Sequence, residues 1–474
     1  MKRASAASGS AGTWELRRPE RQLLLGCLLC VTLGFMMVLG SGRAEGRPIA
    51  ILDLQPLLAY AASLLALHLT LVLFRFQGDR ILPAAVAFLS GLGLLAQYRM
   101  GAFADAGPAA WVRYLVPAGV LIMLGVCVVG MRGRYRGLAA GPWVWAGLSL
   151  ALVAAVLVTG QRFRGGVFAA GFVTPTEALK LTLVLFLAGL IDREAKPLGK
   201  WGGPLPVPPL KGLLPLIGFW ALLASLLFLQ RDLGMLVILS VALLVMLAVG
   251  TGRIGYLVYG VLAASGLGYL ALSLFVHGQR RIQAWLAPFD DPTGDGWQVL
   301  QGLSGMYAGG LWGEGFGRGN PEYTPIAESD FIYSVIGEEL GFVGCVMLVV
   351  FFLILFARGL RIADATRSSY GTLLCAGLTT VLATQTFLNL GGVTKLIPLT
   401  GVTLPFISQG GSSLLTAFAS LGLILAVSDG ERPRPHLRPT LARRRPGKSA
   451  AKRETARKRT AGTRLSQISP PRWQ

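Results

Sequence analysis

The chain has 474 residues, of which 53% are hydrophobic and only 14% are charged, and its mean hydropathy is +0.60. A soluble globular domain carries about a quarter charged residues, so this composition excludes an ordinary soluble protein. It favours an integral membrane protein, in which each helix needs about 20 largely apolar residues to cross the hydrocarbon.

Uncharged stretches of about this length recur along the chain, so the sequence predicts an all-α polytopic membrane bundle with about 12 transmembrane helices. The first stretch follows a charged segment and lacks an obvious small-residue cleavage site, so we expect a retained span and not a signal peptide. The predicted spans are residues 23–41, 52–75, 81–98, 111–131, 142–160, 173–192, 213–230, 233–250, 256–276, 331–357, 371–393 and 399–427.

The basic residues predict the orientation, because Lys and Arg of short loops are retained on the cytoplasmic side. An N-terminus in the cytoplasm places most of them inside, including the loops "MRGRYRG" and "DREAKPLGKW". With 12 spans both termini are cytoplasmic. Residues 277–330, between the ninth and tenth spans, then form a large extracytoplasmic loop.

Two basic segments flank the predicted bundle. Residues 431–474 are rich in Pro, Lys and Arg, have little to bury and supply more than half of the net charge of +21. This composition predicts a disordered cytoplasmic tail, and residues 1–22 resemble it more weakly. A polybasic segment beside a span favours anionic membrane lipids as its partner over nucleic acid, which we do not expect to bind.

Ionisable residues inside apolar stretches are costly and suggest function. The run "TPTEALKL" carries Glu177 and Lys180, which are three residues apart and share one helix face. A self-neutralising pair near a membrane boundary is the simpler interpretation. Arg164 lies just before this run, in the preceding external loop. In "QRDLG", Arg231 and Asp232 separate two apolar runs and predict a tight bend at the outer face, unless they only form a solvated turn.

The predicted outer loop contains the densest polar sequence. It begins with Asp290, Asp291 and Asp295 in "DDPTGDGWQVLQ", continues through a glycine-rich stretch and ends in acids before the tenth span. Clustered glycines suggest backbone packed closely or folded into re-entrant turns. Their GxGxG spacing is not that of a nucleotide loop, since no strand precedes it and no GK[ST] follows. Acids and basic residues beside an apolar bundle suit a substrate that is part lipid and part polar headgroup.

Five blocks in order, between about residues 160 and 427, resemble the SEDS family (shape, elongation, division and sporulation), of which RodA and FtsW are familiar members. "TPTEALKL" resembles the PSExxK run of that family, "QRDLG" its QPDLG and "DDPTGDGWQVLQ" its DPxGxGYQxxQ. "SDFIYSVIGEELGFVG" and "NLGGVTKLIPLTGVTLPFISQGGSSLL" resemble its two later signatures. The chain departs from the family pattern at Arg231, Trp297, Gly302, Glu328 and Gln409, which puts substrate details and partner contacts in doubt more than the reaction.

The resemblance implies a peptidoglycan glycosyltransferase that polymerises lipid II at the outer face of the bacterial cytoplasmic membrane, in cell elongation or division. It implies a ten-helix SEDS core at residues 81–430, so residues 23–80 look like two additional N-terminal helices. The catalytic aspartate of the family maps onto Asp291. A class B penicillin-binding protein is the implied partner, alongside lipid II and the growing lipid-linked glycan chain.

Elementary chemistry is consistent with this role for Asp291. A carboxylate can take the proton of an attacking sugar hydroxyl, and a lipid diphosphate leaves readily once cations compensate its charge. Arg280 and Arg281 are further candidates for such cations. A divalent cation, Mg²⁺ or Mn²⁺, on Asp290 or Asp295 is left open, and no other cofactor or metal ligand is predicted. The predicted substrate-binding residues are Glu177, Lys180, Arg164, Asp232, Gln298, Asp330 and Glu338.

Two other classes of function fit the same composition. A flippase or transporter for a lipid-linked oligosaccharide would also use many spans and buried ions, but it predicts that Asp291 is dispensable. A non-catalytic scaffold for a transpeptidase predicts that charge-preserving changes in the outer loop are harmless. The resemblance to the SEDS family favours the transferase over both alternatives.

Overall fold

The computed structural model describes residues 14–15, 17–44, 51–101, 113–163, 166–168, 174–201, 208–274, 276–294 and 296–430, so the predicted tail 431–474 lies outside the described part. The described chain is helical almost throughout, as predicted. Its elements are α2 (Arg18–Ala44), η1 (Ile51–Leu54), α3 (Gln55–Leu73), α4 (Ile81–Arg99), α5 (Leu115–Gly130), η3 (Arg134–Ala140), α6 (Pro142–Thr159), β1 (Gln161–Phe163), β2 (Gly166–Phe168), η4 (Pro175–Ala178), α7 (Leu179–Leu198), α8 (Leu210–Gln230), α9 (Leu233–Thr251), α10 (Gly255–Leu274), α11 (Val276–Leu286), α12 (Trp297–Gly309), η5 (Pro321–Tyr323), α13 (Ile332–Ala365), α14 (Ser369–Val393) and α15 (Gly411–Asp429).

A long helix lies in each of the twelve ranges that hydropathy predicts as spans. In the described part, nine helices are long and apolar enough to cross a membrane, and the bent pair α5 and η3 brings the number to ten. Helices α7 and α10 complete the twelve but do not meet the same criteria. The protein is therefore a multi-pass helical membrane protein, and the count of 12 spans stays a prediction.

Three local predictions need correction. The all-α expectation misses a short antiparallel pair, β1 and β2, in which Gln161 faces Phe168. The span predicted at 173–192 begins as the 3-10 turn η4, and its α-helix runs from Leu179 to Leu198. The last span, predicted at 399–427, becomes helical only at Gly411. Residues 395–410 are apolar, but the backbone turns at Gly401 and Phe406, both with positive φ, and cannot continue a helix there.

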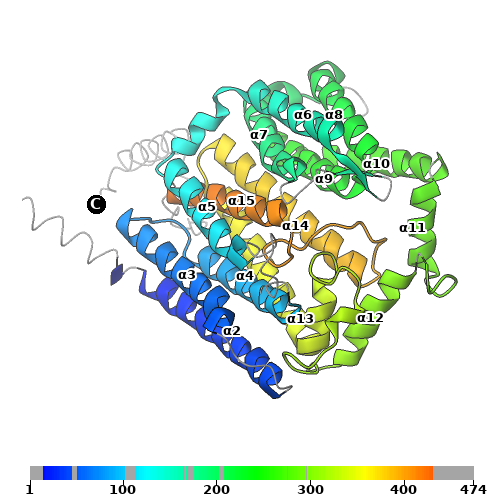
Figure 1. Cartoon of the computed structure of the whole chain (residues 1–474). Coiled ribbons are helices and arrows are strands. Elements are labelled where there is room, and N and C mark those ends of the chain that lie inside the picture. The colour runs from blue at the N-terminus through cyan, green and yellow to red at the C-terminus, as the bar shows by residue number, and fades with distance from the viewer. Residues whose placement is uncertain are drawn as a thin grey trace, which may run out of the picture. The chain divides into compact units, whose positions relative to one another are not determined.

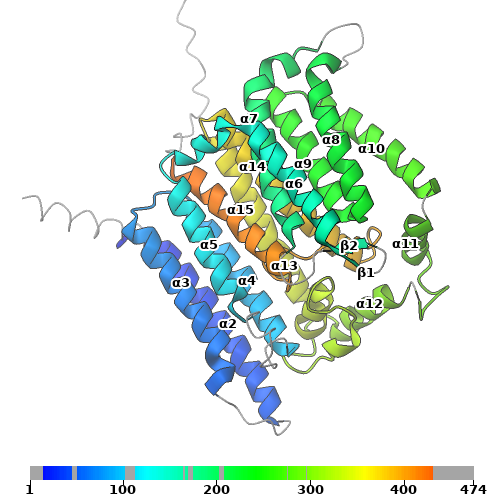
Figure 2. The same cartoon turned by 45° about the horizontal axis from the view of Figure 1, so that its top comes forward.

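Three helices form the centre of the bundle. α4, α14 and α15 bury most of their surface, whereas α2, α6 and α8 leave much of theirs exposed, as membrane-facing helices do. α15 packs along α5, and α14 packs against α13, α9 and α7. Figures 1 and 2 show α14 and α15 surrounded by the other helices, with α2 and α3 at one edge and α8 and α10 at the opposite edge.

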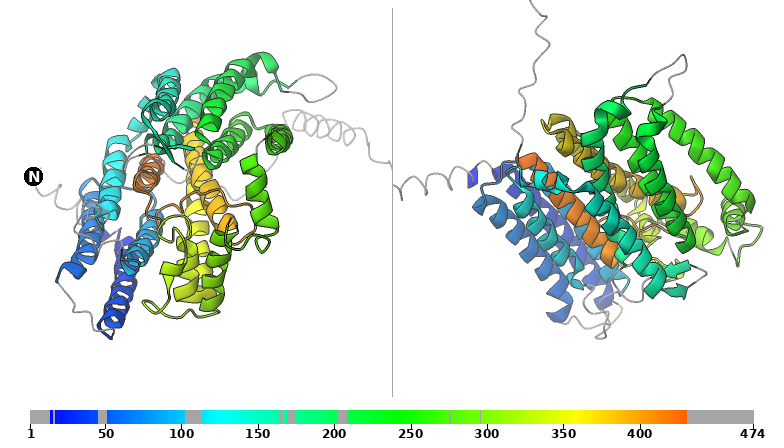
Figure 3. Two further views of the ribbon diagram at one scale, coloured as in Figure 1. Left: turned by 45° about the vertical axis from the view of Figure 1, so that its right-hand side comes forward. Right: turned by 90° about the horizontal axis from the view of Figure 1, so that it is seen from above.

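The N-terminal helices α2 and α3 pack against α4. Figure 3 shows them as the blue helices at the edge of the bundle. The Tyr60 hydroxyl donates a 2.6 Å hydrogen bond to the carbonyl of Ala87. A side chain at Gly91 would meet Val31 and the Tyr60 hydroxyl within 2.7 Å, so only glycine allows this approach. α2 and α3 are thus an integral part of the folded bundle.

The predicted outer loop is largely helical. It contains α11, α12 and η5, and between them lie residues 287–296, here called the aspartate loop, and residues 310–319, here called the glycine loop. Gly341 has a left-handed backbone (φ 67°) and interrupts α13. The glycine loop pairs with this break, because Phe342 N–H donates to the Gly310 carbonyl and Gly315 N–H to the Glu339 carbonyl. The predicted close backbone packing at these glycines is confirmed.

Candidate active site

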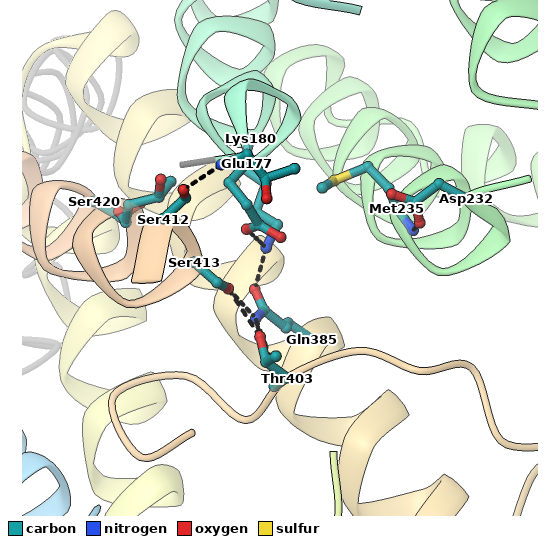
Figure 4. Close-up of polar contacts among 11 residues, drawn as sticks. Glu177, Lys180, Asp232, Met235, Gln385, Thr403, Ser412, Ser413 and Ser420 are labelled. Carbon is teal, nitrogen blue, oxygen red and sulfur yellow. Dashed lines mark hydrogen bonds and ion pairs between the residues drawn. The ribbon is translucent and has the colours of Figure 1, made fainter. Parts of the chain in front are cut away.

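A buried cluster of polar side chains lies where α7, α14 and α15 meet (Figure 4). The Lys180 ammonium donates to Glu177 Oε2 at 2.6 Å and to Gln385 Oε1 at 2.8 Å. The Gln385 amide nitrogen donates in turn to the Thr403 carbonyl at 2.9 Å and to Ser413 Oγ at 3.1 Å. We call these five residues the inner polar cluster. Its ion pair is the one predicted from sequence, and its Lys180 side chain is 4% exposed.

The first turns of η4 and α15 position residues of this cluster. Pro175 begins the turn η4, which suits proline because its missing N–H needs no partner there, and Glu177 follows it at the positive end of α7. Ser412, in the first turn of α15, accepts a 2.6 Å hydrogen bond from Thr174 N–H and so fixes that turn against α15. The same segment therefore holds Glu177 in reach of Lys180.

Asp232 lies at the two-residue turn between α8 and α9. The turn is confirmed: Arg231 ends α8 in the left-handed conformation, and Asp232 caps α9 by accepting from Met235 N–H at 2.9 Å. Burial raises the pKa of Asp232 above its ordinary value, and Glu177 raises it further, whereas the Met235 hydrogen bond, Lys180 and Arg281 lower it. Asp232 thus shares the electrostatic environment of the inner polar cluster.

The turned segment 395–410 joins the cluster to the outer loop. The Asn389 amide donates to the carbonyls of Asp330 and Val402, at 2.9 and 2.7 Å. Ser408 Oγ donates to the Ser329 carbonyl, and Gln409 N–H donates to the Glu328 carbonyl. The residues just before α13 are therefore fixed to the start of α15.

Helix α11 brings positive charge to this junction. Trp285 Nε1 donates to the Lys395 carbonyl at 2.9 Å, and Arg281 Nη1 lies 3.5 Å from the Thr400 carbonyl. Burial raises the pKa of Asp330, a hydrogen bond from Ser329 lowers it, Glu328 raises it and Arg281 lowers it. Arg281 therefore lowers the pKa of both Asp232 and Asp330.

The aspartate loop lies on the neighbouring face of α11. Asp291 is exposed, its Oδ1 accepts from Gly294 N–H at 3.0 Å, and its carbonyl accepts from Gly296 N–H at 3.1 Å. Its carboxylate borders a small pocket of about 80 Å³ that Arg280, Asp290 and Gly296 also line. An acidic and a basic residue, both exposed, thus line one small pocket.

Glu338 and Glu339 belong to a separate cluster beneath the glycine loop. Glu338 is buried and accepts from Asn320 N–H at 2.6 Å. Glu339 pairs with Arg99 at 3.0 Å, and Arg99 also donates to the Gly319 carbonyl at 2.6 Å. These contacts fix the glycine loop to α4 and α13, and they give Glu338 no contact with the inner polar cluster in the described part of the chain.

The structure therefore brings together some of the predicted site residues. Glu177 and Lys180 form an ion pair and both affect the pKa of Asp232, Arg281 lowers the pKa of Asp232 and of Asp330, and Asp291 and Arg280 line one small pocket. Gln298 lies half-buried in the first turn of α12. Arg164 and Asp295 lie outside the described residues. Among those described, no three His, Cys, Asp or Glu side chains come together in a way that would hold a metal ion.

Two central residues were missed from the sequence. Gln385 and Asn389 are one helical turn apart on α14 and bury their amides in the site. Neither residue is ionisable, so the cost of burying a charge within an apolar run does not point to them. Buried amides also need hydrogen-bond partners, so their spacing of four in a long apolar helix was a usable signal.

The comparisons with known proteins agree with one another. A family model described as cell cycle protein (FtsW/RodA/SpoVE) matches residues 80–432. The peptidoglycan glycosyltransferase RodA of Mycobacterium tuberculosis (strain ATCC 25618 / H37Rv) is 34% identical over 451 residues, covering 89% of this chain and 93% of that protein. Stage V sporulation protein E of Bacillus subtilis (strain 168) is 35% identical over 259 residues, or 54% of this chain and 68% of that protein.

Two solved structures are similar in fold. One belongs to a peptidoglycan synthase complex that coordinates polymerization and crosslinking, with a TM-score of 0.59 and 30% identity, covering 74% of this chain and 98% of that one. The other is the rod shape determining protein RodA of Thermus thermophilus, with a TM-score of 0.53 and 27% identity, covering 76% of this chain and 99% of that one. The matched family region begins at residue 80, after α2 and α3.

Proposed function

This chain belongs to the FtsW/RodA/SpoVE family of cell cycle proteins, and from that premise we propose that it polymerises lipid II into glycan strands. It is a peptidoglycan glycosyltransferase, the activity by which its relatives are named. The reaction takes place at the outer face of a bacterial cytoplasmic membrane, with both termini of the chain in the cytoplasm.

The observation that supports the mechanism is the position of Asp291. Asp291 is exposed, lies outside the membrane-spanning helices and lines a small pocket together with Arg280. The acceptor hydroxyl attacks the anomeric carbon of the donor, the new glycosidic bond forms as the bond to the diphosphate breaks, and Asp291 takes the hydroxyl proton. The lipid diphosphate leaves with the bonding electron pair.

Fixed cations compensate the charge that develops on this leaving group. Arg280 lies at the pocket, and Arg281 and Lys180 lie in the region of Asp232. Glu177 holds the Lys180 ammonium in place. Asp290 lines the same pocket as Asp291, and a divalent cation held by Asp290 or Asp295 would supply further positive charge beside the diphosphate.

The partners follow from the chemistry and from the relatives. The complex that resembles this chain joins polymerization to crosslinking, which supports a transpeptidase of the class B penicillin-binding type as partner here. The basic tail 431–474 binds anionic lipids of the inner leaflet through its net positive charge.

The test is polymerisation of labelled lipid II by the purified protein, with and without its cognate transpeptidase. Wild type yields a ladder of glycan strands, and Asp291→Asn yields none. Thr293→Ala, at an exposed residue of the same loop, is the matched control and should yield a ladder close to that of wild type. Equal ladders from wild type and Asp291→Asn would end the role of Asp291 as base. Scrambling of lipid II in vesicles by a chain that makes no polymer would favour the flippase.

A further inference from the structure

The Lys180 ammonium has a defined geometry. It is tetrahedral and carries three N–H groups. In the described part of the chain, two of these groups donate to Glu177 and Gln385. Two N–H groups that are held by hydrogen bonds fix the direction of the third N–H. An anionic oxygen that binds Lys180 must therefore approach along this third N–H. The position of the Gln385 oxygen therefore decides from where Lys180 can receive a ligand.

The Gln385 amide has only one satisfactory orientation. Its oxygen accepts from Lys180, and its nitrogen donates to the Thr403 carbonyl and to Ser413 Oγ. A flipped amide would place its NH₂ against the ammonium and its oxygen against the Thr403 carbonyl. Both contacts would be repulsive, and the side chain is only 1% exposed, so water cannot relieve them. Figure 4 shows this amide between Lys180 and Thr403.

Asn389 provides an internal comparison. It lies one turn further along α14, is equally buried, and its amide ties the same segment 395–410 through the Val402 carbonyl. Its other hydrogen bond goes to the Asp330 carbonyl and not to Lys180. Both residues anchor the segment to α14, and Gln385 differs in holding the ammonium.

We propose that Gln385 is a positioning residue that aims the Lys180 ammonium at the diphosphate of the lipid-linked donor. The inference rests on the proposed function, because it takes the diphosphate of lipid II as the anion. It assigns to α14 a part in donor binding that requires no contact between Gln385 and the substrate.

The net charge around the Lys180 ammonium allows a second test of the proposal. Glu177 and Lys180 cancel one another, and Gln385 is neutral, so the contact set around the ammonium has no net charge. Gln385→Glu keeps the size of the side chain and an oxygen toward Lys180, but it adds a negative charge at a nearly dry site. This variant should repel a diphosphate, whereas Gln385→Met adds no charge and removes the contacts of Gln385 to Lys180, Thr403 and Ser413.

The test is a double-mutant cycle on the full-length protein in lipid nanodiscs, with the Kd for fluorescent lipid II as readout. We expect Gln385→Met to weaken binding about tenfold in the wild-type background and less than about twofold in the Lys180→Met background, because the ammonium is then gone. Asn389→Leu is the matched control, and any loss it causes should be the same in both backgrounds.

The possible outcomes distinguish a failure of the inference about Gln385 from a failure of the proposed function. An equal loss from Gln385→Met in both backgrounds would reduce Gln385 to a structural anchor and overturn the inference. If Gln385→Met does not fold, Gln385→Glu decides: we expect weaker binding than wild type, and unchanged binding would overturn the inference. A wild type that binds lipid II and makes no polymer would contradict the proposed function and leave the binding cycle interpretable.

Discussion

The inner polar cluster and the aspartate loop hold their charged groups in different ways. Lys180 is buried and held by residues of η4 and α14, and the cluster reaches on to the segment 395–410 and α15. Asp291 is exposed, and its described hydrogen bonds are to Gly294 and Gly296, within its own turn. The difference fits the proposed roles, in which the buried cluster binds the anion and the exposed loop supplies the base.

Asp291→Asn should give the largest effect and separates activity from stability. Loss of a general base typically costs about 10²–10⁴-fold in rate. Because Asp291 is exposed, the free energy of unfolding should change by less than about 0.5 kcal/mol. Polymerisation rate and thermal unfolding in detergent measure the two quantities. A large drop in Tm would mean that the aspartate loop contributes to the stability of the bundle.

Lys180→Met, unlike Asp291→Asn, should lower stability. It leaves the Glu177 carboxylate beside a buried apolar side chain, and removing one partner of a buried pair typically costs about 3 kcal/mol of stability. A clear fall in Tm is therefore expected, together with weaker binding of lipid II. The double variant Glu177→Gln/Lys180→Met should recover part of the lost stability, because no charge is then left unpaired. An unchanged Tm in Lys180→Met would show that water reaches the pair.

Gly294→Ala tests whether the aspartate loop sets the direction of its carboxylate. A Cβ at this position would collide with the Asp291 carboxylate, lying 2.7 Å from its Cγ, and no backbone atom is among its nearest neighbours. The base is kept but displaced, and we expect about a tenfold loss in kcat, since displacements near 1 Å can cost up to about 100-fold. Thr293→Ala, on an exposed neighbour, is the control and should be close to wild type. Equal rates in the two variants would show that the loop rearranges freely.

The two regions also differ in how far the sequence predicts them. Hydropathy locates the helices, and the pair Glu177 and Lys180 follows from their spacing, because both signals are local. The error at 399–410 arises because this turned segment is as apolar as a helix and is folded by distant partners, including Gln385, Asn389 and Glu328. The pocket between Arg280 and Asp291 was equally out of reach, since it depends on how α11 packs beside the aspartate loop.

Asp330→Asn should give the smallest effect and concerns the junction between the two regions. Burial raises the pKa of Asp330, so the folded protein holds this proton more tightly than the unfolded chain does. Stability contributed by the protonated form is present below the ordinary Asp pKa and is lost as pH rises through the raised value. Asn cannot ionise, so the variant should show a flatter dependence of Tm on pH above the ordinary Asp range and a gain of less than about 1 kcal/mol at neutral pH. A loss at neutral pH would instead show that the charge of Asp330, held beside Arg281, stabilises the junction more than its burial costs.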